Sequence, residues 1–157
     1  MKDLTLKVAD GILNVRVGAI IMKDGKFLMV GNKTQDYLYS VGGRVHFGET
    51  FEEAVKREVL EETGVEMEID RLGFIHENFF ISNTWDEKGL LVQELSIYFY
   101  MKTPEKFEPV CTDLCEEGVE QNLYWISPYD EGVKYYPEFF KTELRNPVDY
   151  VKHFVTK

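Results

Sequence analysis

The pattern of hydrophobic and polar residues along the chain predicts a series of strands and two helices. Strands are expected where β-branched and aromatic residues are frequent: residues 15–22, 27–30, 37–41, 91–101 and 123–126, with one or two more within 65–81. The segment Lys23-Asp24-Gly25-Lys26 is expected to form a hairpin turn, because Asp-Gly tolerates the positive φ that such turns need. The clearest strand, 91–101, is expected to place five apolar residues on one face: Leu91, Leu95, Ile97, Phe99 and Met101.

A helix is predicted from Thr50 to Thr63, and its ends carry recognisable signals. Thr50 and Glu53 fit a capping box, and Gly64 stands where a glycine commonly ends a helix. Three residues at helical spacing are expected to face the core: Phe51, Val55 and Val59.

A second helix is predicted near the end of the chain, from about Pro137 to Arg145, with Phe140 and Leu144 turned inward. An acidic loop is expected over about residues 102–120. Strands mixed with two helices favour an α/β or α+β fold with a mixed sheet. Because 157 residues suit one hydrophobic core, we expect a single domain over residues 1–157.

Composition and charge indicate which binding partners and which cellular compartment to expect. The chain holds 28 Asp and Glu against 18 Lys and Arg, a net charge of −10, so duplex nucleic acid is not an expected partner. No apolar stretch approaches the ~18–20 residues of a membrane span, and the first residues lack a leader pattern, so we expect a cytoplasmic protein without membrane association. The two cysteines, Cys111 and Cys115, are fewer than the about four ligands of a structural zinc site, which favours thiols in a reducing compartment.

Three carboxylates on the first predicted helix are candidates for a metal-binding site. Glu58, Glu61 and Glu62 fall within an arc of about 100° on one face, and Ala54 on the same arc leaves room above them. Their mutual repulsion costs ~0.2–0.5 kcal/mol per pair, and the negative end of the helix dipole disfavours them further. A divalent cation such as Mg²⁺ or Mn²⁺ reverses both effects, whereas a solvated acidic helix face is the alternative interpretation.

The residues around these glutamates resemble the Nudix box. Gly43 is followed by five residues and then Glu49, and seven more residues lead to Arg57-Glu58-Val59-Leu60-Glu61-Glu62-Thr63-Gly64-Val65. Every fixed position of the motif is met over 23 residues, from Gly43 to Val65. The sequence departs from the commonest form at Val41, where proline often precedes the two glycines.

The resemblance implies a Nudix fold, an α/β/α sandwich around a mixed β-sheet. It also implies an enzyme that uses Mg²⁺ or Mn²⁺ to hydrolyse the diphosphate linkage of a nucleoside diphosphate joined to another group, X. By the motif, the metal ligands are the three glutamates Glu58, Glu61 and Glu62 and the carbonyl of Gly42. Glu61 and Glu62 are also candidates for the general base.

The resemblance implies further site residues around that core. Arg57 and Glu49 match a supporting pair that we group with the catalytic residues, although a structural salt bridge is the alternative interpretation. Glu120 is the candidate for a carboxylate from a later loop that completes the metal site, in competition with Glu116 and Glu117. A solvated acidic loop is the alternative interpretation for all three of these later residues.

Substrate-binding residues are predicted with less support from spacing. Arg44 is the candidate for a phosphate contact because it adjoins Gly43, with Arg16 as an alternative. Phe79 and Phe80 are candidates for stacking on a base, while a place in the core is the alternative.

The predicted substrate is a small molecule of the nucleotide or nucleotide-sugar type, and a homodimer is possible. The alternative function is a non-catalytic Nudix-fold domain that binds a nucleotide as a sensor. Such domains typically lose one or more of the glutamates, and all are present here. A calcium-binding acidic domain is disfavoured because calcium loops space their ligands along a turn with an internal glycine.

Overall fold

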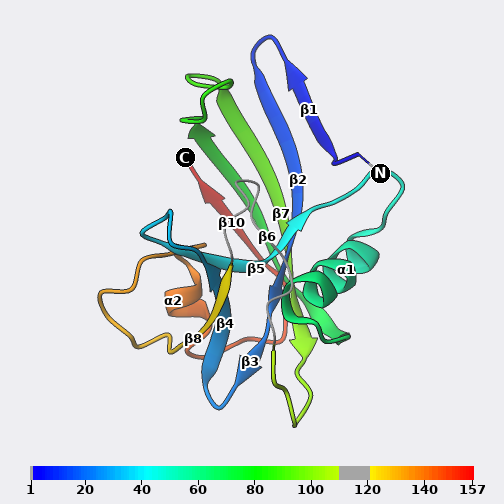
Figure 1. The fold of residues 1–157 in the computed structure, drawn as a ribbon, viewed down its shortest axis with the longest axis vertical. Helices are drawn as coiled ribbons and strands as arrows, with labels where there is room; N and C mark the ends of the chain where they lie inside the picture. The colour runs from blue at the N-terminus through cyan, green and yellow to red at the C-terminus, as the bar shows by residue number, and fades with distance from the viewer. Residues whose placement is uncertain (1, 110–120) are drawn as a thin grey trace.

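The computed structural model describes residues 2–109 and 121–157 as a mixed α/β fold built on one large sheet (Figure 1). Its strands are β1 (Thr5–Val8), β2 (Gly11–Ile20), β3 (Met22–Lys23), β4 (Lys26–Gly31), β5 (Leu38–Arg44), β6 (Glu68–Ile81), β7 (Leu91–Lys102), β8 (Asn122–Ile126), β9 (Tyr135–Tyr136) and β10 (Lys152–Thr156). The strand order is β10-β6-β7-β2-β5-β4-β3, and β1, β8 and β9 pair with β2, β4 and β5. The sheet is mixed because β2 runs parallel to β7, β6 to β10 and β5 to β9, whereas the other pairs are antiparallel.

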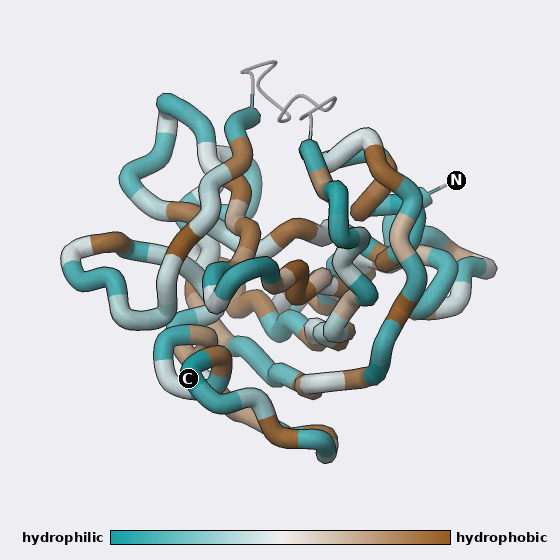
Figure 2. Tube along the Cα trace, turned by 90° about the horizontal axis from the view of Figure 1, so that it is seen from below, coloured by the Kyte–Doolittle hydropathy of each residue, from teal (hydrophilic) through white to brown (hydrophobic). Residues whose placement is uncertain are grey.

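The two helices lie on opposite faces of the sheet. On one face, α1 (Phe51–Thr63) buries Val55 and Val59 in a core cluster with residues of β2, β4, β5 and β7. On the other face, α2 (Phe140–Glu143) places Phe140 in an aromatic cluster with Phe27 and Phe74. Figure 2 shows apolar segments concentrated towards the middle of the molecule. This arrangement confirms the predicted α/β/α sandwich around a mixed sheet. Within the part of the chain that the structure describes, no helix is long and apolar enough to cross a membrane.

The ends of α1 confirm the predicted caps. The side chain of Thr50 accepts a hydrogen bond from the Glu53 N–H over 3.1 Å, and the Glu53 carboxylate accepts one from the Thr50 N–H over 2.8 Å. Gly64 ends the helix in the left-handed region, with φ 74°, and its N–H donates to the carbonyl of Leu60. The hairpin turn is also confirmed, since Asp24 and Gly25 both have positive φ.

Two predicted helical features differ from the structure. Phe51 was expected in the core but is 39 % exposed, because it belongs to the first turn, at the edge of the packed face. The second helix is much shorter than residues 137–145, although Phe140 and Leu144 are buried as predicted.

The strands also differ from the prediction in extent and number. Within the predicted range 65–81 the structure has one long strand, β6 (Glu68–Ile81), whose bulges break the strict alternation of side chains. Leu91 does not join the buried face of β7, because it lies at the start of the strand, beyond the reach of α1. The sequence prediction missed β1, β9 and β10, which are short strands without an apolar run, held by neighbouring strands.

Candidate active site

Two glycines near the end of β5 bring this strand close to both β2 and α1. A Cβ on Gly42 would lie 2.1 Å from the carbonyl oxygen of Val17, and the φ of Gly42, 151°, is rare for residues with a side chain. A Cβ on Gly43 would lie 2.4 Å from Oε1 of Glu58. Glycine at these positions therefore lets β5 lie against β2 and lets the Glu58 carboxylate lie directly against the main chain of β5.

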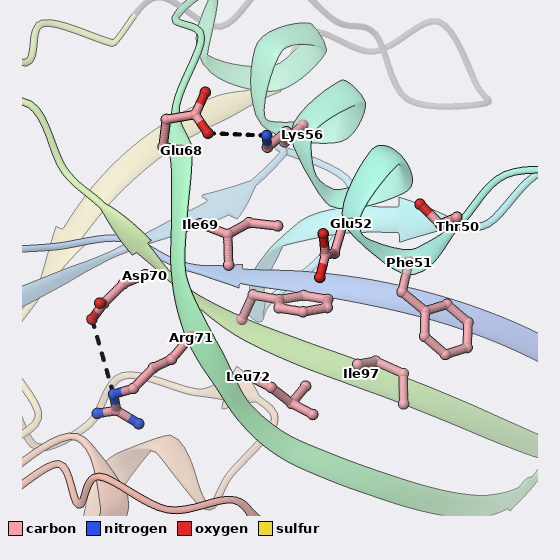
Figure 3. A pocket seen from close by; sticks show the side chains of 11 residues that line it. Thr50, Phe51, Glu52, Lys56, Glu68, Ile69, Asp70, Arg71, Leu72 and Ile97 are labelled. Carbon is pink, nitrogen blue, oxygen red and sulfur yellow. Dashed lines mark hydrogen bonds and ion pairs between the residues drawn. The ribbon is translucent and has the colours of Figure 1, made fainter.

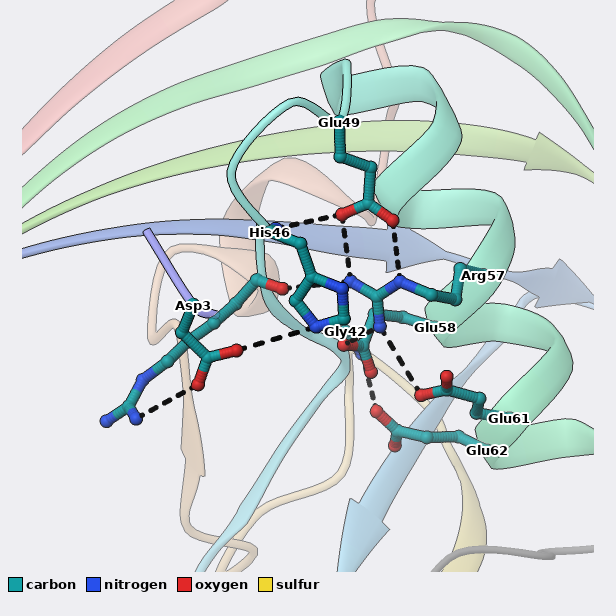
Figure 4. A network of polar contacts seen from close by, with 9 residues as sticks. Asp3, Gly42, His46, Glu49, Arg57, Glu58, Glu61 and Glu62 are labelled. Atoms are coloured by element: carbon teal, nitrogen blue, oxygen red, sulfur yellow. Dashed lines mark hydrogen bonds and ion pairs between the residues drawn. The ribbon is translucent and has the colours of Figure 1, made fainter. Parts of the chain in front are cut away.

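The three glutamates predicted to share a face of α1 all lie on the side of the helix that faces the end of β5 (Figure 4). Glu62 is buried, and its Oε1 accepts a hydrogen bond from the Gly42 N–H over 3.0 Å. Glu58 is also buried, whereas the side chain of Glu61 is 47 % exposed. The site therefore combines two carboxylates held by the fold with a third that has access to solvent.

Arg57 connects these carboxylates to the loop that precedes α1. Its Nε and Nη2 donate to the two carboxylate oxygens of Glu49 over 2.6 and 3.0 Å, a bidentate pair. Nη2 also donates to the main-chain carbonyl of Arg44, and Nη1 donates to Glu58 over 2.8 Å and to Glu61 over 3.4 Å. The structure thus brings together Glu49 and Arg57, which the motif pairs, and adds a direct link from Arg57 to the glutamates.

Burial and ion pairing shift the proton affinities of this network in opposite directions. Hydrogen bonds from Arg57 hold the pKa of Glu49 below its ordinary value, and the main-chain N–H of His46 adds to this effect. The same pairing with Glu49 raises the pKa of Arg57, which therefore stays charged. Burial raises the pKa of Glu58, and the hydrogen bond from Arg57 offsets only part of that effect. A further cation beside Glu58 would stabilise its ionised form.

The donor set of the site fits a hard divalent cation. Three carboxylates and the nearby carbonyl of Gly42 offer only oxygen atoms, the ligands that Mg²⁺ and Mn²⁺ prefer. Because Gly43 has no side chain, the buried carboxylate of Glu58 can lie directly against the main chain of β5. Among residues 2–109 and 121–157, however, no three His, Cys, Asp or Glu side chains are gathered closely enough to hold a metal. In this structure Nη1 of Arg57 binds one carboxylate oxygen of Glu58 and one of Glu61.

The predicted phosphate contact, Arg44, lies at the end of β5 with its side chain next to Asp3. Its Nη1 is 3.5 Å from the Asp3 carboxylate, and Arg16 lies opposite Arg44 in the β2–β5 register. Arg16 therefore lies on β2 next to the end of β5, one residue from the partner of Gly43. The sequence prediction missed Asp3, because no motif marks this residue near the start of the chain.

The predicted stacking residues, Phe79 and Phe80, are not in contact with the carboxylates. Phe74 is level with Gly42 across β7 and β2, so Phe79 and Phe80 lie about 15–20 Å further along β6, at about 3.3 Å per residue. Because they are neighbours in a strand, their side chains point to opposite faces of the sheet. At most one of the two can therefore line any given face.

Several predicted residues lie outside the part of the chain that the structure describes. They are the candidate metal ligand Glu120, its competitors Glu116 and Glu117, and the two cysteines Cys111 and Cys115.

An open groove of about 800 Å³ lies between α1 and β6 (Figure 3). Its helix residues include Glu52, which is on the opposite flank of α1 from Glu61 by helical spacing. Ile69, Leu72, Ile97 and Phe99 give it an apolar lining, and an ion pair of Lys56 with Glu68 lies at its rim. Among the residues that the structure describes, the proposed ligands Gly42, Glu58, Glu61 and Glu62 do not line this groove. The chemistry of the carboxylates, and not the size of the cavity, therefore marks the candidate active site.

Comparison with known proteins gives the family. The family model of the NUDIX domain matches residues 13–140, which is most of the chain. No curated protein matches. Among solved structures, the MutT protein from Methanosarcina mazei is 21 % identical, with 88 % of this chain and 94 % of that chain covered and a TM-score of 0.58.

Two further structures show the same fold. The mutator MutT protein from Bacillus halodurans is 17 % identical, with 90 % of each chain covered and a TM-score of 0.59. The MutT NUDIX hydrolase from Burkholderia pseudomallei is 23 % identical, with 75 % of this chain and 85 % of that chain covered and a TM-score of 0.54. The family match and the complete Nudix box lead to one conclusion: the chain belongs to the Nudix family of pyrophosphohydrolases.

Proposed function

We propose that this protein hydrolyses the diphosphate linkage of a nucleoside diphosphate joined to a second group, X, in a reaction that depends on Mg²⁺ or Mn²⁺. One observation supports the proposal: Glu58, Glu61 and Glu62 all face the end of β5, where Gly43 leaves room for the Glu58 carboxylate and the Gly42 N–H binds Glu62. Like-charged side chains gathered in this way, two of them buried, suit a bound cation better than they suit stability alone.

In this proposal the metal ligands are Glu58, Glu61, Glu62 and the carbonyl of Gly42, with Glu120 as the candidate from the later loop. When bound, the metal would neutralise the diphosphate and lower the pKa of a water molecule. Glu61, the exposed member of the set, is the first candidate for the base that would take the proton of this water molecule, and Glu62 is the second.

The remaining residues of the network position these groups. Arg57 holds Glu49 and the carbonyl of Arg44 at once, and this fixes the loop between β5 and α1 relative to the helix. Its bonds to Glu58 and Glu61 hold these two carboxylates near one another. We therefore assign Arg57 and Glu49 a positioning role.

The substrate would lie across the end of β5. Arg44, with Arg16 beside it, is the candidate to bind phosphate oxygens, since both lie close to Gly42 and Gly43. A nucleotide-type substrate extends well beyond its phosphates. Contact of Phe79 or Phe80 with the end of the substrate that is far from the phosphates therefore stays a prediction, and neither residue is assigned a role in the chemistry.

A panel of substrates tests the proposed activity. The protein is incubated with Mg²⁺ and nucleoside triphosphates, ADP-ribose, nucleotide sugars or dinucleoside polyphosphates, and phosphate-containing products are measured. We expect turnover of at least one member, abolished by chelation and restored by Mn²⁺. Binding of a nucleotide without turnover across the whole panel would contradict the proposal and favour a sensor.

A matched pair of variants tests the residues. Glu61→Gln is expected to reduce kcat by about 10²-fold or more with little change in melting temperature, because it removes a charge in an exposed part of the site. Glu52→Gln makes the same chemical change on the other flank of α1 and is expected to keep full activity. Equal activities of the two variants would refute the assignment of Glu61.

A further inference from the structure

The face of the sheet opposite α1 carries polar side chains beyond the end of β5. Side chains alternate along β2, so Asn14 lies on the opposite face from Val15 and Val17, which join the core under α1. β5 pairs with β2 only over Arg16–Ala19, and at Asn14 the neighbour of β2 on that side is β1. The polar side chains therefore continue along the sheet from the candidate active site.

Strand register arranges four of these side chains in one line across the sheet. They are direct cross-strand partners in turn, about 4.8 Å apart from strand to strand, and we call them the polar row: Thr5 on β1, Asn14 on β2, Glu94 on β7 and Asn78 on β6. Asn14 is only 7 % exposed, and the other three are half-buried. Because covered positions of a sheet are ordinarily apolar, a line of four polar residues there calls for a polar partner.

Two atoms of the polar row show this need directly. The amide oxygen Oδ1 of Asn14 and the hydroxyl Oγ1 of Thr5 are both buried, and neither has a hydrogen-bond partner among the residues that the structure describes. A buried polar group left without a partner costs about 1–3 kcal/mol, so most such groups in folded proteins are satisfied. A polar ligand at the row would remove that cost.

The polar row lies within reach of a nucleotide whose phosphates are at the candidate active site. Gly42 pairs with Gly18 on β2, and Asn14 is four residues further along β2, about 13 Å at 3.3 Å per residue. Arg16 lies midway between them on the same face. With the phosphates beside Gly42 and the ribose at the level of Arg16, the base of a nucleotide lies at the polar row.

The chemistry of this part of the sheet suits a base. The ionised carboxylate of Glu94 can only accept hydrogen bonds, so it complements N–H donors, and the amide of Asn14 can both donate and accept. The next level of the sheet on the same face is apolar and holds Ile12, Val92 and Phe80. The ring of Phe80 is 42 % exposed. A base has a polar edge for the row and flat apolar faces for the neighbouring side chains.

We propose that the polar row recognises the hydrogen-bonding edge of the substrate's base, and that Glu94 and Asn14 select bases that carry an amino group. An amino group of cytosine, adenine or guanine donates to the carboxylate of Glu94. Uracil presents a carbonyl oxygen in place of the cytosine amino group, and hypoxanthine lacks the amino group of guanine. The proposal rests on the proposed function for the place of the phosphates, and it adds the class of base that the substrate contains.

Binding of nucleotides that differ by one amino group tests the proposal. Isothermal titration calorimetry in Mg²⁺ compares CDP with UDP, and GDP with IDP, as analogues whose two phosphates are joined by a methylene group and cannot be hydrolysed there. We expect the wild-type protein to bind the amino-bearing member of at least one pair about 10-fold more tightly or better. Glu94→Gln keeps the size of the side chain and is expected to reduce this preference to about 2-fold or less.

Asn14→Thr is the second variant, because a β-branched residue suits a strand and the amide is lost. It is expected to weaken binding of the preferred analogue about 10-fold. Glu77→Gln is the matched control, since Glu77 adjoins Asn78 on β6 but lies on the opposite face of the sheet, and it should keep the wild-type preference. Circular dichroism and melting curves should confirm that each variant is folded.

The outcomes separate this proposal from the proposed function. A wild-type protein that binds none of the analogues, or binds both members of each pair equally, would overturn the base recognition even if it hydrolyses a substrate of the panel. A preference that survives in both folded variants, or that is lost in Glu77→Gln, would also overturn it. An amino-group preference that depends on Glu94, in a protein without turnover, would support the recognition and contradict only the proposed hydrolysis.

Discussion

Replacing Gly43 with alanine would test whether the open space beside β5 positions the carboxylate of Glu58. The new Cβ would lie 2.4 Å from Oε1, 2.5 Å from Cδ and 2.7 Å from Oε2 of Glu58, where ordinary contacts begin at 3.4 Å. The carboxylate must therefore withdraw by about 1 Å, and a displacement of that size in a catalytic group costs roughly 10²-fold in rate. Crowding should also lower the free energy of unfolding by about 1–3 kcal/mol.

The assay compares kcat/KM and Mn²⁺ affinity of Gly43→Ala with those of a second crowded glycine variant. Gly73→Ala is the control, because its Cβ would lie 2.7 Å from the ring of Tyr100, away from the carboxylates. Both variants should melt at lower temperature, but only Gly43→Ala should lose metal affinity and turnover. Equal turnover and metal affinity in the two variants would refute the role given to this space.

Three further predictions concern the stability of the fold. Arg57→Lys cannot reproduce the bidentate pair with Glu49 and should lose about 1–2 kcal/mol in urea unfolding; an unchanged midpoint would contradict the network. Thr50→Ala should destabilise the protein by about 1 kcal/mol, because it removes the side chain that caps α1, whereas Thr50→Ser keeps a hydroxyl and should not. Equal melting temperatures of the two variants would contradict a stabilising role of this cap. Burial lowers the pKa of His76, so the unfolded state takes up a proton first and stability falls as the pH drops below about 6.5. His76→Gln should flatten this dependence in unfolding curves between about pH 7.5 and 5.5, and parallel curves would contradict it.

Much of the fold was predictable because local signals and tertiary contacts agree. The cap of α1 depends on Thr50 and Glu53, which are three residues apart, and the hairpin turn depends on Asp24 and Gly25. Such features need no knowledge of distant segments. β10 shows the opposite case, since it forms only because β6 offers a partner edge about 80 residues away in sequence.

The candidate site, too, has features that the sequence predicts and features that only the structure shows. Helical spacing places Glu58, Glu61 and Glu62 on one face, and the structure has them there. Spacing cannot reveal that Arg57 already binds two of them, because that contact depends on rotamers. The Gly42 N–H bond to Glu62 joins residues that are distant in sequence, and it likewise emerges only from the fold.

Locating Mn²⁺ in crystals of the protein by anomalous scattering tests the central claim most directly. The account predicts a peak bounded by the carboxylates of Glu58, Glu61 and Glu62 and the carbonyl of Gly42, and no peak there in Glu61→Gln crystals at the same Mn²⁺ concentration. An active protein whose Mn²⁺ binds elsewhere, with Glu58 and Glu61 still bound to Arg57, would contradict it.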